Sequence, residues 1–216
     1  MLRSLTGLFL ALLLPVASAQ GVSVVSQYQR GVQYQRITPA RPLDRSNRRI
    51  EVIEVFSYAC PHCYEFQTYA EQLRRGLPPN AYFVRLPAVF WAQWEPFARA
   101  FFTAEHFGVA VKANHALFDA IWVKHEQLGT LAQLASFYAR YGIRPERFLA
   151  VARSARITAK IRHAERLEQQ WGVNGTPAIV VDGAWRSGRV DSYDQLLGVA
   201  RYLVQRAEAE RAQVAR

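Results

Sequence analysis

Hydrophobic residues along the chain change their spacing several times, and each spacing predicts a different element. Residues 50–56 and 82–86 are short apolar runs, which are typical of buried strands. Between them, apolar residues recur every three or four positions and predict a helix that begins at Pro61 and ends at Gly76. Residues 34–38 can form an edge strand, because prolines follow them closely and would stop it.

Helical spacing then dominates residues 88–171. Glycines interrupt it and mark the ends of separate helices: Gly108, Gly129 and Gly142. The last helix of this stretch has one apolar face from Ile157 to Trp171, and Gly172 is suited to cap its end.

Strand spacing returns after that helix. Residues 178–181 predict a strand, Asp182-Gly183 is a hairpin turn signal, and residues 184–186 form the returning strand. Ser192 and Gln195 form a capping-box pattern for a last helix through about residue 208.

These elements predict an α/β fold in which a strand–helix–strand unit and a later hairpin–helix unit share one mixed sheet. Residues 88–154 are then a helical insertion, while residues 20–87 and 155–216 form the domain that contains the sheet. The length of 216 residues fits one domain with an insertion.

The N-terminal residues 1–19 have the pattern of a secretory signal peptide. Arg3 supplies a positive start, residues 8–14 are apolar, and Ala17-Ser18-Ala19 is a small-residue cleavage site. A membrane anchor is the alternative, but the apolar stretch is too short to span a bilayer and no second one follows it. We therefore expect an exported protein, cleaved before Gln20.

Cys60 and Cys63 are the only cysteines of the chain. A disulfide between them would close too small a loop to restrain the unfolded chain, so a purely structural role is disfavoured. A zinc half-site would need further ligands, and most of the histidines are scattered without ligand spacing. A thiol pair at a strand-to-helix junction suits redox chemistry, because helix amides and the helix dipole stabilise a thiolate. We expect no bound metal and no cofactor beyond a redox-active Cys60–Cys63 disulfide.

The net charge of +10 first suggests nucleic acid as a partner. Export argues against that, and the arginines are spread along the chain rather than clustered. We predict no nucleic acid, and either a solvated basic surface or a preference for acidic partners or an anionic membrane face.

Two segments resemble a known family. Residues 54–66, with Cys60-Pro61-His62-Cys63 at their centre, resemble the active-site segment of the DsbA family of periplasmic thiol:disulfide oxidoreductases. Residues 172–177 resemble the segment that carries the cis-proline of the thioredoxin superfamily. The resemblance implies a thioredoxin-like fold with an inserted helical domain, and a protein that introduces disulfides into exported proteins.

The motif assigns roles to its own residues. Cys60 is expected to be the exposed nucleophile and Cys63 the buried partner, one helical turn further on. Pro61 starts the helix and removes an N–H donor near the sulfur. His62 can give the thiolate a positive charge or a hydrogen bond, unless it is an ordinary loop histidine.

Outside the motif, three residues are candidates for the site. Pro177 is expected to be cis, which would present the Thr176 backbone to an extended substrate, although an ordinary trans turn is the commoner case. Glu54 is either an outward-facing strand residue or a buried carboxylate that relays protons to Cys63 and raises its pKa.

The chain departs from the family pattern at two places. The position four after the second cysteine, acidic in better-known members, is Gln67, and we expect the neighbouring Glu65 to face elsewhere. Many relatives carry valine where this chain has Thr176. A separate aromatic stretch is either core or the lining of a substrate groove: Phe90, Trp91, Trp94 and Phe97.

The favoured hypothesis is therefore a monomeric periplasmic enzyme that oxidises cysteine pairs of exported proteins. The resemblance implies a DsbB-type, quinone-linked membrane partner that reoxidises it. Two alternatives stay open: an isomerase or reductase kept reduced in the same compartment, which Thr176 favours, and a chaperone that uses the groove while its cysteines are incidental.

Overall fold

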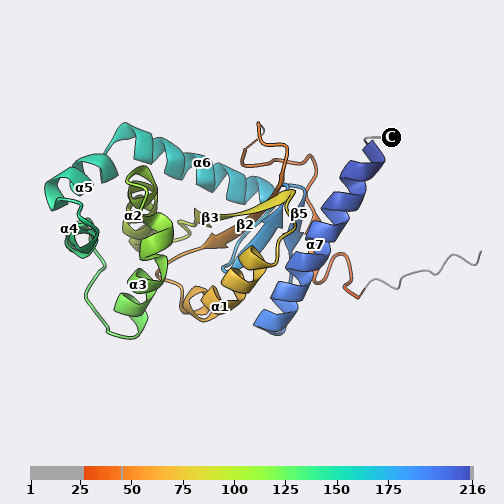
Figure 1. The fold of residues 1–216 in the computed structure, drawn as a ribbon, viewed down its shortest axis with the longest axis horizontal. Helices are drawn as coiled ribbons and strands as arrows, with labels where there is room; N and C mark the ends of the chain where they lie inside the picture. The colour runs from red at the N-terminus through yellow and green to blue at the C-terminus, as the bar shows by residue number, and fades with distance from the viewer. Residues whose placement is uncertain (1–26, 45, 215–216) are drawn as a thin grey trace, which may run out of the picture.

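A single mixed sheet of five strands forms the centre of the molecule (Figure 1). The computed structural model describes residues 27–44 and 46–214, so the predicted signal peptide lies outside the described residues. The strands are β1 (Tyr34–Arg36), β2 (Ile50–Phe56), β3 (Ala81–Pro87), β4 (Ala178–Val181) and β5 (Trp185–Ser187). They lie in the order β1-β5-β4-β2-β3, with β3 parallel to β2 and β4 antiparallel to it.

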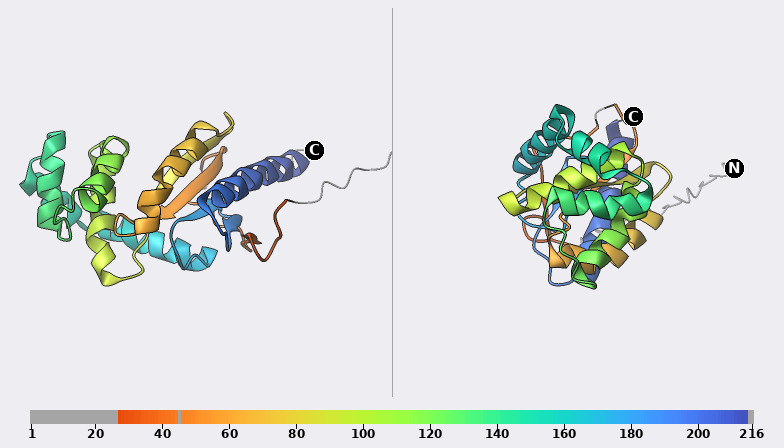
Figure 2. Two further views of the ribbon diagram at one scale, coloured as in Figure 1. Left: turned by 90° about the horizontal axis from the view of Figure 1, so that it is seen from below. Right: turned by 90° about the vertical axis from the view of Figure 1, so that its left-hand side faces the viewer.

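Helices cover both faces of this sheet. On one face lie α1 (Pro61–Arg75) and α7 (Tyr193–Val214), and on the other lies α6 (Ala155–Trp171) (Figures 1 and 2). The remaining helices gather at one end of the sheet: α2 (Glu95–His106), α3 (Ala110–Trp122), α4 (Leu131–Tyr138) and α5 (Pro145–Ala152), with short 3-10 turns at Ala92–Trp94 and Ala139–Tyr141.

Strand β2 explains why its sequence is apolar along its whole length. Alternate residues point to opposite faces of a strand. Ile50 and Val52 pack with α1 and α7, whereas Ile53 and Val55 pack in the core that α6 and the helical segment share. With helices on both faces, every residue of the strand is buried.

Most predicted elements are confirmed, several to the residue. Strands β2 and β4 have the predicted ends, and α1 begins at Pro61 and is capped by Gly76. Gly172 caps α6 with a left-handed φ of 67°. The final helix is longer than predicted and reaches Val214.

The hairpin between β4 and β5 shows why its sequence contains Asp-Gly. Asp182 and Gly183 both have positive φ angles, of 54° and 56°. A side chain at Gly183 would also collide with the backbone of Arg41, so only glycine fits there.

The segment predicted as an insertion is helical from α2 to α5, and its boundaries remain predictions. Its buried residues belong to the same hydrophobic cluster as one face of the sheet. Within the part of the chain that the structure describes, no helix has the length and hydrophobicity needed to cross a membrane.

Candidate active site

Cys60 lies at the junction of the central strand and its helix. It is the N-cap of α1, and its carbonyl accepts hydrogen bonds from the amides of Cys63 and Tyr64, at 3.1 and 3.2 Å. Pro61 occupies the first turn, and no acidic side chain lies there to oppose the positive end of the helix dipole. The predicted placement at a strand-to-helix junction is therefore confirmed.

The sulfur of Cys60 is more enclosed than expected. Cys60 is only 5% exposed, so the prediction of an exposed thiol is wrong. The cause is the loop before β4, whose Thr176 carbonyl oxygen lies 3.5 Å from Cys60 Sγ. Cys63 is fully buried, as predicted.

The two thiols differ in acidity. The pKa of Cys60 is lowered to about 6, chiefly by a hydrogen bond from the Cys63 thiol. The Thr176 side chain and the backbone N–H groups of Cys63 and His62 add to this, while burial opposes it. The pKa of Cys63 is raised by burial, by the neighbouring Cys60 and by the charge of Glu54. The pair therefore ionises at Cys60 first.

Glu54 is buried beneath this pair, which confirms that it does not face solvent. Strands β2 and β3 place it opposite Arg85, whose Nε donates to Glu54 Oε2 at 2.8 Å. Burial raises the pKa of Glu54, and the guanidinium opposes that shift. Arg85 was missed because its relation to Glu54 depends on the register of two parallel strands. We call Glu54 and Arg85 the buried pair; the role of Glu54 in proton relay remains a prediction.

The side chain of His62 points to a different neighbour from the one expected. Its Nδ1 lies 3.0 Å from the Tyr193 hydroxyl and 3.4 Å from Glu65 Oε2, while its backbone N–H serves Cys60. The Tyr193 hydroxyl donates to Glu65, and this bond and the one with His62 lower the pKa of Glu65. Glu65 thus faces His62 on the exposed side of α1. We call His62, Glu65 and Tyr193 the surface cluster.

The bond between Thr176 and Pro177 is cis, as predicted. These two residues line an open cavity of about 620 Å³ that extends past Gly188 and Arg186. The cavity therefore gives an extended chain room to reach the Thr176 backbone beside Cys60. Whether Thr176 and Pro177 bind substrate remains a prediction.

The other residues singled out from the sequence have separate outcomes. Trp94 and Phe97 are buried core residues, Phe90 is half-buried, and Trp91 is 54% exposed. Gln67 is buried with its Oε1 unpaired among the described residues. In residues 27–44 and 46–214, no three His, Cys, Asp or Glu side chains are grouped so as to hold a metal ion.

Comparison with known proteins finds one family throughout. The family model described as DSBA-like thioredoxin domain matches residues 82–201. The thiol:disulfide interchange protein DsbA of Pseudomonas aeruginosa is 33% identical over 205 residues, covering 94% of this chain and 97% of that protein. The DsbA of Pseudomonas syringae pv. tomato is 32% identical over 206 residues, with 94% and 96% covered. The crystal structure of oxidoreductase DsbA from Xylella fastidiosa superimposes with a TM-score of 0.79 at 34% identity, covering 83% of this chain and 97% of that one.

Proposed function

This chain belongs to the family of DsbA-like thioredoxin domains, and from that premise we propose that it transfers a disulfide to cysteine pairs of exported proteins. It is a thiol:disulfide oxidoreductase. The observation that carries the proposal is the unequal acidity of its two thiols: Cys60 with a pKa of about 6 beside Cys63 with a raised one.

The exchange proceeds in two steps. A substrate thiolate attacks Cys60 Sγ of the oxidised protein, a substrate–Cys60 disulfide forms, and the Cys60–Cys63 bond breaks with its electron pair on Cys63. A second substrate thiolate then attacks the substrate sulfur of this mixed disulfide, and Cys60 leaves as a thiolate. Two electrons pass from the substrate to the protein, which ends as a dithiol.

The acidity of Cys60 favours this direction of transfer. A stabilised thiolate is a good leaving group, and it stabilises the reduced protein relative to the disulfide. Cys63 has the opposite requirement, because it must take up a proton once it is released. We assign that proton to Glu54, whose own pKa is raised by burial.

Thr176 has two parts in this scheme. Its side chain helps to stabilise the Cys60 thiolate, and its backbone offers strand-like hydrogen bonds to a substrate lying in the adjacent cavity. Pro177 supports that backbone.

The setting of the reaction is also part of the proposal. The signal-peptide pattern of residues 1–19 supports export to the periplasm, where a DsbB-type, quinone-linked membrane protein would reoxidise the dithiol. We propose that the protein works there as a monomer, without nucleic acid and without a bound cofactor.

One pair of measurements tests the function. The reduction potential of the Cys60–Cys63 couple is measured against glutathione, and the pKa of Cys60 from thiolate absorbance. A potential well above that of glutathione together with an acidic Cys60 is the expected result. A thioredoxin-like potential with a Cys60 pKa near its ordinary value would instead identify a reductase or isomerase.

A further inference from the structure

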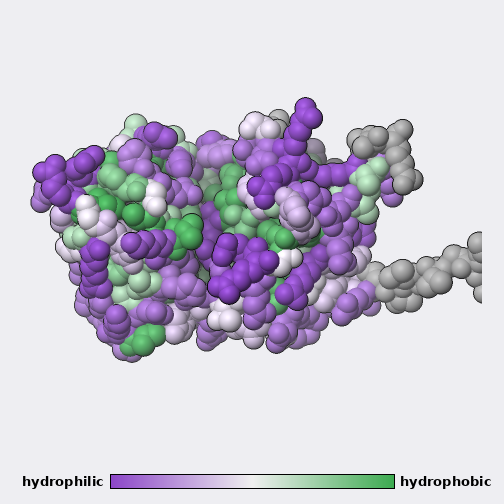
Figure 3. All heavy atoms as spheres, in the orientation of Figure 1, coloured by the Kyte–Doolittle hydropathy of each residue, from purple (hydrophilic) through white to green (hydrophobic). Residues whose placement is uncertain are grey.

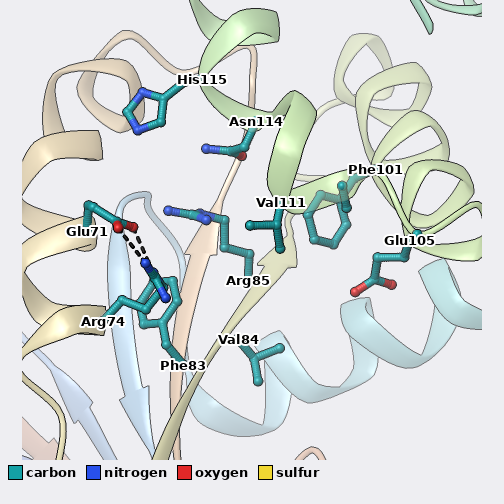
Figure 4. Close-up of a pocket in the computed structure, with 12 residues that line it drawn as sticks. Glu71, Arg74, Phe83, Val84, Arg85, Phe101, Glu105, Val111, Asn114 and His115 are labelled. Carbon is teal, nitrogen blue, oxygen red and sulfur yellow. Dashed lines mark hydrogen bonds and ion pairs between the residues drawn. The ribbon is translucent and has the colours of Figure 1, made fainter. Parts of the chain in front are cut away.

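A cavity of about 380 Å³ lies away from the cysteine motif, between the sheet and the helical segment. Its walls come from β3, α1, α2 and α3 (Figure 4). The surface is visibly hollowed at this junction, with apolar residues on both sides of the hollow (Figure 3). The volume falls within the range of about 300 to 1,000 Å³ that is typical of small-molecule sites.

One end of this cavity is rich in hydrogen-bond donors. Asn114 is 2% exposed, its Oδ1 accepts from the Tyr58 hydroxyl at 3.1 Å, and its Nδ2 has no partner among the described residues. Arg85 uses Nε for Glu54, and within the described chain its other two nitrogens have no hydrogen-bond partner. In Figure 4 the Asn114 amide, the Arg85 guanidinium and the His115 ring border the same space.

The acidic residues of the cavity are already neutralised. Glu71 accepts from Arg74 Nε and Arg75 Nε, each at 2.8 Å, and Glu105 is paired with Lys160 at 3.0 Å. The donor-rich end therefore lacks an acceptor, since each nearby carboxylate is held by a cation.

The rest of the wall is apolar. It is formed by Phe83, Val84, Phe101 and Val111. A ligand that fits both ends has a hydrocarbon or aromatic body and one anionic oxygen group.

We propose that this cavity binds a small amphipathic carboxylate, with its carboxylate on Arg85 and Asn114 and its apolar body against Phe83, Phe101 and Val111. The inference goes beyond disulfide exchange, which proceeds without any such ligand.

Arg85 also connects this cavity to the cysteine pair. The same guanidinium that faces the cavity holds Glu54, and Glu54 acts on Cys63. A carboxylate at Arg85 competes with Glu54 for the cation and brings negative charge toward the thiols. The reduced protein carries the Cys60 thiolate, so it binds the anion more weakly than the oxidised protein does. By reciprocity the ligand then favours the disulfide form to the same extent.

Binding is tested with phenylbutyrate as the probe and phenylbutyramide as its uncharged control. Each is titrated into the oxidised and the reduced full chain, and amide NMR shifts of residues 83–85 and 110–115 are followed. Phenylbutyrate is expected to shift these amides and to bind the oxidised form about fivefold more tightly. Binding of the amide with equal affinity would overturn the role of the carboxylate, and equal affinity for the two redox forms would overturn the coupling.

Two exposed valines of the α3 region provide a matched pair of variants. Val111 is 81% exposed at the cavity, and Val123 is 56% exposed at the other end of the helix. Val111→Glu is expected to weaken phenylbutyrate binding several-fold by charge repulsion, while Val123→Glu leaves it unchanged. Arg85→Gln is expected to abolish it. Unchanged binding in both Val111→Glu and Arg85→Gln would place the probe elsewhere and overturn the site.

Discussion

The buried pair and the surface cluster each place a carboxylate near the same two cysteines, yet their surroundings shift its pKa in opposite directions. Glu54 is enclosed by the sheet and helices, and burial raises its pKa even though Arg85 contacts it. Glu65 is exposed, and hydrogen bonds from Tyr193 and His62 lower its pKa. Burial thus makes Glu54 a group that can hold a proton for Cys63, whereas Glu65 stays charged and screened by water.

The largest expected effect comes from the thiols between these two carboxylates. Cys60→Ser should reduce disulfide transfer to a dithiol peptide more than about 1,000-fold, the scale on which removing a nucleophile affects an enzyme. Cys63→Ser should also stop turnover, but it should accumulate a mixed disulfide between Cys60 and the peptide, detectable by mass spectrometry. Accumulation in the Cys60→Ser protein instead would reverse the roles of the two sulfurs.

A second buried carboxylate separates burial from pairing. Glu168 on α6 is buried, its Oε1 has no partner among the described residues, and its pKa is raised to about 8 by burial and by Glu165. Because the folded protein holds this proton at pH values where the unfolded chain has lost it, stability falls as pH rises from about 4.5 toward 8.

Glu168→Gln should remove this pH dependence. We expect the variant to be more stable than the parent by on the order of 3 kcal/mol at pH 8, with the difference disappearing near pH 4. Urea unfolding of both reduced proteins across this range measures it. A difference that does not change with pH would show that Glu168 is charged in the folded protein.

Glu54→Gln tests the buried pair directly. Removing the carboxylate removes the proton donor proposed for Cys63 and one cause of its raised pKa, so disulfide exchange should slow about tenfold near pH 7. The rate of oxidation of a dithiol peptide, followed from pH 5 to 9, measures the effect. Rates equal to those of the parent at every pH would remove Glu54 from the mechanism.

Glu51→Gln is the matched control for this change. Glu51 lies on the same strand, is also buried, and accepts hydrogen bonds from the amides of Leu43 and Asp44 and from the Tyr82 hydroxyl. Its substitution should lower stability without altering the pH profile of exchange. An equal slowing in both variants would indicate a general loss of packing in the sheet.

These two carboxylates also show how far sequence reasoning reaches. The spacing of apolar residues and the Cys60-to-Cys63 motif predicted β2, α1 and the position of the thiols, because those features depend on neighbours along the chain. Arg85, Tyr193 and Asn114 were missed, since each reaches its partner only through strand register or helix packing. The enclosure of Cys60 was missed for the same reason, because Thr176 comes to it from a distant loop.

The smallest effect is expected from the surface cluster. Glu65→Gln and Tyr193→Phe each remove a hydrogen bond at an exposed site, where water and salt screen the charges. The exchange rate and the reduction potential should therefore change by no more than about twofold in equilibrium or rate. Measured at low and at high salt, any change should shrink as salt is added. A slowing as large as that of Glu54→Gln and insensitive to salt would mean that the surface cluster is desolvated when substrate binds, and that the contrast between the two carboxylates holds only for the free protein.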